Sequence, residues 1–376
     1  MARAYLDHAS SSPLRPSALE AMLPYLREHH ADPGRLHAEG RTTRVALEDA
    51  RTQVAEFFGA RPREVVFTSS GTEAVNTAVW GGLSRAAAGG GHVVTTAVEH
   101  SSVRDAVTRS DAEVTEVGVD SGGRFDAAEV VAAMRTDTQI VSVQLANHEV
   151  GTLQPAAEVC AEARSRGILV HVDACAAAGH VPIDFHTLGA DLCSVTAHKL
   201  GGPKGAGALL VRRGLRIAPL LVGGAQERAR RAGIEDVPAW VGFGAACAAV
   251  DLGREAAAQR ALIATAATVI DRIPDVERFG ASGSEETLPH LLCVGVRGVE
   301  AEPILLGLDQ HGVAVHSGSS CSSEALEPSP VLAAMGVDAD HSLRISVGWS
   351  STAADVERFV EVLPGIVEQL RRLRSP

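Results

Sequence analysis

The sequence predicts an α/β fold, with a mostly parallel sheet in a large domain and a smaller α+β domain. From about residue 43 to about residue 250, short apolar runs alternate with helical patterns. Strands that alternate with helices favour a parallel sheet covered by helices on both faces. Beyond residue 250 the pattern changes to one long alanine-rich helix, then mixed strands and helices. We therefore expect a large domain over residues 15–252 and a small domain formed by residues 1–14 and 253–376.

Apolar periodicity predicts the individual elements. Apolar residues recur at helical spacing from Val45 to Phe58, and Gly59 ends that helix. A further helix is expected to begin near Glu73, after a turn of small residues. The predicted strands of the large domain are 65–68, 93–96, 113–117, 140–145, 168–172, 192–195 and 208–211. The predicted elements of the small domain are helices 256–273, 301–311 and 353–373 and strands 291–296 and 342–347.

Composition narrows the class of protein. Hydrophobic residues make up 45% of the 376 residues, which is typical of a globular chain with a large core. Aromatic residues make up only 3%, so the core must consist mainly of alanine, valine and leucine. The formal net charge of -12 argues against a broad nucleic-acid-binding face, and we expect no direct binding of nucleic acid.

The six cysteines and the apolar stretches indicate the compartment. No two cysteines have the C-x-x-C spacing of zinc or redox sites, so no metal site is expected. Their density is too low for a disulfide framework, which favours a reducing compartment. No stretch approaches the roughly 20 apolar residues of a membrane span, and the first residues lack an apolar signal region. We expect a soluble, cytoplasmic protein.

Segment 194–205 is the strongest local feature. An apolar strand leads through Thr196 and His198 to Lys199, which a glycine-rich turn follows. A lysine in this position can bond covalently to a carbonyl compound if its amine is partly desolvated. A solvated loop lysine is the alternative, and the motif alone does not decide between them.

Asp173 follows the predicted strand 168–172, at the edge where parallel sheets bind ligands. A buried aspartate needs a cationic partner, and a protonated pyridine nitrogen is one such partner. A helix cap is the alternative. The turn of small residues that contains Gly71 and Thr72 lies between a strand and a helix, so its N–H groups could bind a phosphate. His100 also follows a strand and could lie against a flat aromatic cofactor, although a structural histidine is as compatible with the spacing.

Cys321 lies in a run of small polar residues, which predicts an exposed loop and a cysteine that can act as a nucleophile. The other five cysteines have apolar or helical surroundings, and we expect them to be inert packing residues. Arg344 is a single arginine in a strand-like run. Such a residue usually pairs with a carboxylate, which could be that of a substrate.

Together these residues resemble those of the cysteine desulfurases, fold-type I pyridoxal-phosphate (PLP) enzymes of the class V aminotransferase family. The similarity extends from Tyr5 to the last helix. The small-residue loop that ends at Cys321 resembles the iron–sulfur-cluster and nitrogenase-type branch. The motifs that carry the resemblance are 32–37, 71–73, 99–100, 147–151, 173, 198–199, 223–227 and 317–321.

The resemblance implies an activity. Sulfur is removed from L-cysteine, L-alanine is released, and a persulfide on Cys321 is passed to an acceptor protein. It also implies a PLP cofactor, a seven-stranded sheet and a homodimer with active sites near the subunit interface.

The resemblance also implies a role for each site residue. Lys199 holds PLP covalently and moves protons, Asp173 keeps the pyridine nitrogen protonated, and His100 stacks on the ring and takes part in acid–base steps. Gly71, Thr72, Thr196 and His198 bind the phosphate. Arg344 binds the substrate carboxylate, with Asn147 beside the substrate, and Cys321 attacks the substrate sulfur.

The chain departs from the family at several positions. His148 and Ala176 replace an asparagine and a glutamine that flank the phenolic oxygen of PLP. Our hypothesis is that a single imidazole N–H of His148 takes over both amide contacts. Ile234 replaces a threonine that reaches the phosphate of the neighbouring subunit. Two further differences are Ser10-Ser11-Ser12 in place of Ala-Thr-Thr and Asp32 in place of asparagine.

Two other functions stay open at this stage. A selenocysteine lyase or another PLP-dependent β-lyase would keep the cofactor residues but would tolerate loss of Cys321. A non-enzymatic scaffold kept for partner contacts would not need Lys199, Asp173 and Arg344 together. The sequence leaves the sulfur acceptor and its end use open among iron–sulfur clusters, tRNA or DNA thiolation and thio-cofactors.

Overall fold

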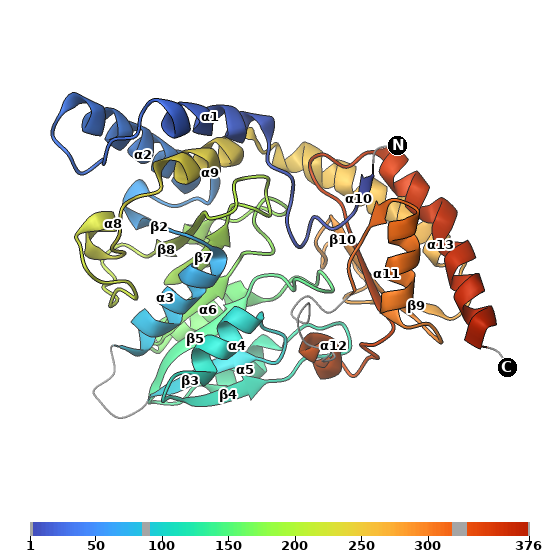
Figure 1. Ribbon diagram of the computed structural model, residues 1–376. Coiled ribbons are helices and arrows are strands. Elements are labelled where there is room, and N and C mark those ends of the chain that lie inside the picture. Colours follow the sequence, from blue (N-terminus) through green and yellow to red (C-terminus); the bar gives the residue numbers. More distant parts are fainter. Residues whose placement is uncertain (1–2, 85–90, 318–328, 375–376) are drawn as a thin grey trace.

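The computed structural model describes residues 3–84, 91–317 and 329–374 and contains a central seven-stranded sheet (Figure 1). Its strand order is β2-β8-β7-β6-β5-β3-β4. The strands are β2 (Val65–Thr68), β3 (His92–Thr96), β4 (Glu113–Val117), β5 (Thr138–Gln144), β6 (Leu169–Asp173), β7 (Leu192–Thr196) and β8 (Gly207–Val211). All seven predicted strands are therefore present, with ends that agree to within two residues.

The large sheet is parallel except for β8, which runs antiparallel to both β2 and β7. A parallel connection needs a crossover of a dozen or more residues, usually a helix, and the loop 197–206 between β7 and β8 is shorter. These observations confirm the predicted α/β class with a mostly parallel sheet. They also place the ends of β6 and β7, at Asp173 and Thr196, on the same edge.

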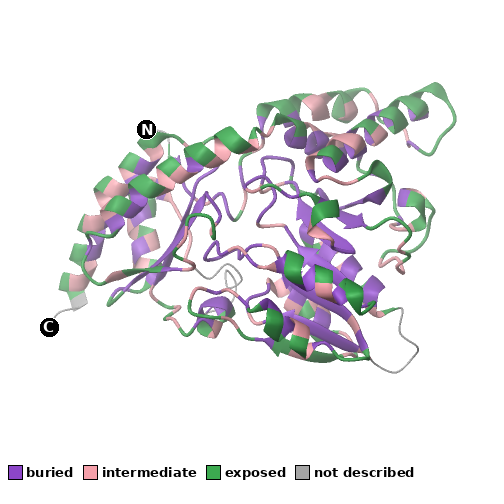
Figure 2. Cartoon of the chain, turned by 180° about the vertical axis from the view of Figure 1, so that it is seen from behind, coloured by how far each residue is buried: buried purple, intermediate pink, exposed green. Residues whose placement is uncertain are grey.

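Helices cover both faces of the large sheet. Val93 and Ile140 pack on one face with α3 (Gly71–Leu83) and α4 (Ser101–Thr108), while Val94 and Val141 pack on the other face. Figure 2 shows the resulting pattern of buried strands and helices that are exposed on their outer sides. The second face is covered by α2 (Ala38–Phe57), α5 (Ala127–Ala133), α6 (Ala156–Ser165), α7 (Phe185–Leu188) and α9 (Val237–Ala249), with α1 (Pro16–Arg27) packed on α9.

The C-terminal part of the chain forms a second layer beside the large sheet (Figure 1). It holds an antiparallel sheet in the order β12-β10-β9 and a core of its own. Its elements are α10 (Leu252–Ile270), β9 (Val276–Phe279), β10 (Leu291–Val296), α11 (Ala301–Gln310), β11 (Val313–Ala314), α12 (Pro330–Ala334), β12 (Ser342–Ser346) and α13 (Ala353–Arg374). The structure thus contains the strands and helices predicted after residue 250, and adds β9, β11 and α12, which the sequence did not predict.

The N-terminal segment joins the two parts of the molecule. The short strand β1 (Ala4–Tyr5) pairs in parallel with β11. The chain then passes the end of β12 and reaches the turn after β7, where the backbone N–H of Ser12 donates to the carbonyl of His198 at 2.9 Å. Residues near the N-terminus therefore stand between the small sheet and Lys199. The predicted domain boundaries at 14 and 252 remain a prediction.

Two shorter segments complete the description. A 3-10 turn (Pro62–Glu64) precedes β2, and a short helical segment α8 (Gln226–Ala229) lies against α2. A buried ion pair fixes α8, because Arg51 of α2 contacts Glu227 at 2.6 Å. In the parts of the chain that the structure describes, no helix is long and apolar enough to cross a bilayer.

Candidate active site

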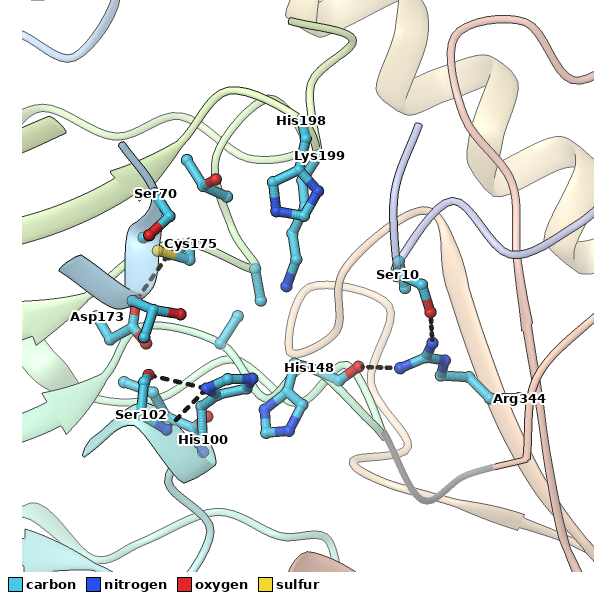
Figure 3. Close-up of a pocket in the computed structure, with 17 residues that line it drawn as sticks. Ser10, Ser70, His100, Ser102, His148, Asp173, Cys175, His198, Lys199 and Arg344 are labelled. Atoms are coloured by element: carbon cyan, nitrogen blue, oxygen red, sulfur yellow. Dashed lines mark hydrogen bonds between the residues drawn. The ribbon is translucent and has the colours of Figure 1, made fainter. Parts of the chain in front are cut away.

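A cavity of about 310 Å³ lies where the strand ends of the large sheet face the N-terminal segment and β12. Figure 3 shows Lys199 extending into its middle, with Asp173 and Cys175 on one side and Arg344 on the other. The large domain contributes most of the lining. The residues that line the cavity are Ala9, Ser10, Ser70, Gly71, Thr72, His100, Ser102, Gln144, Ala146, His148, Asp173, Cys175, Ala176, Thr196, His198, Lys199 and Arg344.

The turn after β7 positions Lys199. Thr196 ends the strand, and the carbonyl of Ala197 accepts hydrogen bonds from the backbone N–H groups of Leu200 and Gly202, which closes the turn. Gly201 has φ of 88°, a conformation that favours glycine. Ser12 donates its hydroxyl to the carbonyl of Lys199 at 3.0 Å. The backbone of Lys199 is therefore held on both sides while its side chain enters the cavity.

Asp173 ends β6 at the floor of the cavity and is 7% exposed. Its Oδ1 accepts the backbone N–H of Cys175 at 3.0 Å. No ion pair is found for Asp173 within residues 3–84, 91–317 and 329–374, so the carboxylate can still accept a cationic partner.

Cys175 corrects one prediction. It was expected to be an inert packing residue, and the packing part is wrong, because Cys175 lines the cavity and its backbone N–H bonds Asp173. Burial, followed by the charge of Asp173, raises the pKa of its thiol well above the ordinary value, so the group stays protonated. The apolar residues around position 175 in the sequence did not indicate this, because β6 has ended and the chain turns back across the strand ends. The cysteines that agree with the prediction are Cys160, Cys193, Cys247 and Cys293, which are buried.

Gly71, Thr72 and Thr196 surround a site for an anion. Ser70 caps α3, since its hydroxyl accepts the backbone N–H of Glu73 at 3.0 Å. The first N–H groups of the helix, at Gly71 and Thr72, have no partner within a helix and lie at the positive end of its dipole. The hydroxyl of Thr196 is fully buried and has no hydrogen-bond partner in the described parts of the chain. A buried hydroxyl of this kind calls for a ligand.

The backbone at Gly71 leaves little room for a side chain. A Cβ on Gly71 would come within 2.6 Å of the sulfur of Cys175. Any larger residue at position 71 would therefore push into the cavity floor. His198 lines the same region, and burial with the nearby charge of Lys199 lowers its pKa to about 4, so the ring is neutral near pH 7.

His100 forms the cap of α4 and one wall of the cavity. Its Nδ1 accepts the backbone N–H of Ser102 at 3.1 Å, which places the ring proton of the neutral form on Nε2. Burial, followed by the charges of His148 and Lys199, lowers its pKa to about 3. The imidazole is therefore neutral near pH 7 and presents an N–H donor.

His148 packs edge-on against His100, with the ring centroids 5.0 Å apart. Its Nε2 lies 3.5 Å from the carboxylate of Glu149, which in turn accepts the hydroxyl proton of Ser329 at 2.5 Å. His148 and Ala176 both line the cavity. The contact with a cofactor oxygen remains a hypothesis.

Asn147, expected beside the substrate, does not line the cavity. It is fully buried, and its Oδ1 accepts the backbone N–H groups of Glu149 and Val150 at 2.8 and 2.9 Å. Its Nδ2 donates to the carbonyl of Val98 at 3.2 Å. All these contacts are internal, so Asn147 shapes the turn that carries His148.

Arg344 reaches the cavity from β12. One terminal nitrogen contacts Asp7 at 3.0 Å and Ser10 at 2.7 Å, and the other donates to the carbonyl of His148 at 3.0 Å. The predicted carboxylate partner is therefore present within the chain itself, at Asp7. The arginine is 1% exposed, and its Nε has no partner among the described residues.

Two positions named from the sequence remain, one outside the described residues and one on the surface. Cys321 lies in residues 318–328, outside the described residues. Ile234 is 69% exposed on the surface near α8. Within residues 3–84, 91–317 and 329–374, no three His, Cys, Asp or Glu side chains are grouped so as to hold a metal ion.

Sequence reasoning missed several residues of the cavity. Gln144 ends β5 and pairs in register with Asp173, and its Nε2 has no partner among the described residues. Its position at the end of a predicted parallel strand was the available signal. The sequence pattern did not indicate Ser10 or Ser102 as cavity residues. Ser10 lies in a loop and Ser102 at the start of α4, both far from Lys199 in sequence.

Comparison with known proteins identifies the family. The Aminotransferase class-V model matches residues 4–359, so the chain belongs to that family. Cysteine desulfurase IscS 1 of Archaeoglobus fulgidus is 39% identical over 378 residues, covering 98% of this chain and 98% of that protein. Cysteine desulfurase IscS of Dictyoglomus turgidum is also 39% identical, and the match covers 98% of this chain and 95% of that protein. Within the class-V aminotransferases, the chain therefore belongs with the cysteine desulfurases.

A solved structure supports the same assignment at the level of the fold. The structure of a NifS-like protein matches with a TM-score of 0.90 at 30% identity, covering 98% of this chain and 100% of that one. The predicted fold type and family are both confirmed by these comparisons.

Proposed function

We propose that the protein is a cysteine desulfurase that uses PLP to take sulfur from L-cysteine, releases L-alanine and leaves the sulfur as a persulfide on Cys321. The observation that carries the proposal is the meeting of Lys199, Asp173, Thr196 and Arg344 in one cavity. They come from three segments, namely the end of β6, the end of β7 with its turn, and β12, and each offers a different chemical group. An amine, a carboxylate, an anion-binding hydroxyl and a guanidinium suit a cofactor and an amino acid bound side by side.

The residues of the cavity fit PLP. The unpartnered hydroxyl of Thr196 and the helix N–H groups of Gly71 and Thr72 would hold the phosphate. Asp173 would hold the ring nitrogen in its protonated form, and Lys199 would bind the carbonyl carbon covalently. His100 would lie against the ring. When bound, PLP supplies an electron sink for the amino acid attached to it.

The protein groups supply binding and proton transfer. Arg344 would bind the carboxylate of cysteine, since a guanidinium forms strong charge-assisted bonds to carboxylates. Lys199 has the one amine in the described lining and would move the proton between carbon atoms of the substrate. His100, with its proton on Nε2, would donate a hydrogen bond toward the substrate.

The sulfur step balances without another reactant. The carbon–sulfur bond of cysteine breaks and a sulfur–sulfur bond to Cys321 forms. The carbon that carried the sulfur is reduced, which gives alanine. The sulfur passes to the enzyme thiol in the oxidation state of elemental sulfur. The protons come from the two thiols, so no external oxidant is needed. The persulfide then passes its outer sulfur to an acceptor protein.

We also propose a homodimer. Large apolar side chains are exposed on α2 and around α8, including Val45 at 60%, Val222 at 79% and Ile234 at 69%. The two segments adjoin, because Arg228 contacts Glu48 of α2 at 3.2 Å. Apolar side chains gathered on one surface favour burial against a second protein. Sedimentation velocity of the wild type and of Ile234→Arg tests this, and a monomeric wild type would contradict it.

Three variants test the proposed activity. Wild-type protein should bind PLP and form alanine from L-cysteine. Lys199→Ala should lose both covalent cofactor retention and alanine formation, whereas Lys204→Ala, an exposed neighbour, should keep them. Cys321→Ala should keep the cofactor and lose persulfide formation. Alanine formation at the wild-type rate by Cys321→Ala would show a different lyase chemistry.

A further inference from the structure

Glu99 is a carboxyl group buried behind the wall of the active-site cavity. It follows β3, directly precedes His100 and is 1% exposed. It has no ion-pair partner among residues 3–84, 91–317 and 329–374. A carboxylate in such a position is costly unless other groups compensate its charge.

The two oxygens of Glu99 have different surroundings. Oε1 accepts the hydroxyl proton of Thr96 at 2.6 Å and the backbone N–H of Gln144 at 3.0 Å. Oε2 is buried and has no hydrogen-bond partner in the described parts of the chain. An ionised carboxylate spreads its charge over both oxygens and needs donors at each. A protonated group with Oε1 as its carbonyl oxygen fits these contacts better.

The charged and titratable neighbours of Glu99 also favour its protonated form. Asp173 lies near Glu99 from the end of β6, His148 from the turn after β5, and the neutral His100 follows in the chain. The pKa of Glu99 is raised to about 8. Burial is the largest cause and Asp173 acts in the same direction, while the hydrogen bonds from Thr96 and Gln144 and the charge of His148 act against them. Two carboxyl groups close together ionise one at a time.

We propose that Glu99 is a positioning residue that works as a neutral carboxylic acid. Through Oε1 it joins the end of β3 to the end of β5, and being neutral it leaves the negative charge at this edge to Asp173. This inference rests on the proposed function, in which Asp173 holds a cationic ring nitrogen. An ionised Glu99 would repel Asp173 and compete for that cation, whereas a neutral one keeps Asp173 as the partner.

The first test uses Glu99→Gln, which keeps the acceptor oxygen and places a neutral amide at Oε2. We expect its PLP dissociation constant to stay within about threefold of the wild-type value, with Glu99→Ala weakening binding by about tenfold or more. Equal weakening in both variants would overturn the proposal. If wild type itself fails to bind PLP, the proposed function is at fault, so the two failures are distinguishable.

The second test measures stability without cofactor. A carboxyl group with a raised folded pKa contributes stability that is fully present below its unfolded pKa and is lost as the pH rises through the folded pKa. The advantage of Glu99→Gln over wild type in unfolding midpoint should therefore grow between about pH 4.5 and pH 8. A constant difference over that range would overturn the proposal.

A third measurement uses the wild-type protein alone, so it does not require that a variant folds. Infrared spectra of the wild type labelled with carbon-13 glutamate should show a protonated carboxyl stretch at neutral pH, where exposed carboxyl groups are ionised. The band should disappear as the pH rises through about 8. Absence of such a band at neutral pH would overturn the inference.

Discussion

The guanidinium of Arg344 contacts the carboxylate of Asp7 at 3.0 Å and thereby ties β12 to the N-terminal segment. The same side chain bonds the carbonyl of His148. Arg344 thus contacts both the N-terminal segment and the turn that carries His148, and these contacts fix the orientation of its planar group. Loss of the two terminal nitrogens of Arg344 should affect substrate binding more than the chemical step.

Arg344→Lys tests this relationship. Lysine offers one flexible ammonium group and cannot replace two terminal nitrogens at once. We expect KM for cysteine to rise by about tenfold or more, with a smaller change in kcat. Arg254→Lys, on the exposed side of α10, is the matched control. An unchanged KM would mean that the cysteine carboxylate binds elsewhere.

Thr196→Val tests the phosphate site. Valine has nearly the shape of threonine but lacks the buried hydroxyl that has no protein partner. Loss of a charge-assisted hydrogen bond should weaken PLP binding by about tenfold. Thr77→Val, which removes a hydroxyl on α3 away from the cavity, should leave the dissociation constant unchanged. Titration of PLP fluorescence measures both values, and equal affinity in Thr196→Val and wild type would argue against the phosphate site.

His148→Ala tests whether His148 serves the phenolic side of the cofactor. Removal of the only proposed N–H donor there should raise the pH at which the visible absorption of bound PLP changes. The measurement is a spectrophotometric pH titration, with His30→Ala, on the surface, as control. Identical titration curves for His148→Ala and wild type would rule out the contact.

The stacked rings of His180 and His290 predict sensitivity to acid. Their centroids lie 3.4 Å apart, and burial lowers the pKa of His180 to about 4 and that of His290 well below its ordinary value. A group with a depressed folded pKa contributes stability above its unfolded pKa and loses it as the pH falls. Wild type should therefore lose stability between about pH 6.5 and pH 4.

Replacement of one ring should reduce this loss. His290→Gln removes one of the two neutral rings, so its unfolding midpoint should fall less than that of wild type over the same interval. His30→Gln, an exposed histidine, should follow the wild-type curve. Parallel curves for all three proteins would show that the stack does not control acid stability.

Local patterns predicted much of the fold. Buried strands such as Val65–Thr68 and Leu192–Thr196 are short apolar runs, and their burial on both faces is what parallel sheets require. The antiparallel direction of β8 escaped prediction because it depends on the length of one loop. β9 escaped it because only one of its four residues is buried.

The sequence by itself determined the family, the strand ends that carry Asp173 and Lys199, and the chemical groups available. The family follows from the order and spacing of many motifs along the chain, and each strand end follows from a local apolar run and the turn after it. Only the tertiary structure decided that Cys175 lines the cavity, that Asn147 is buried away from it and that Glu99 has one oxygen without a donor. Burial and hydrogen bonding depend on segments far apart in sequence, so they are settled only when the sheet and the small domain pack together.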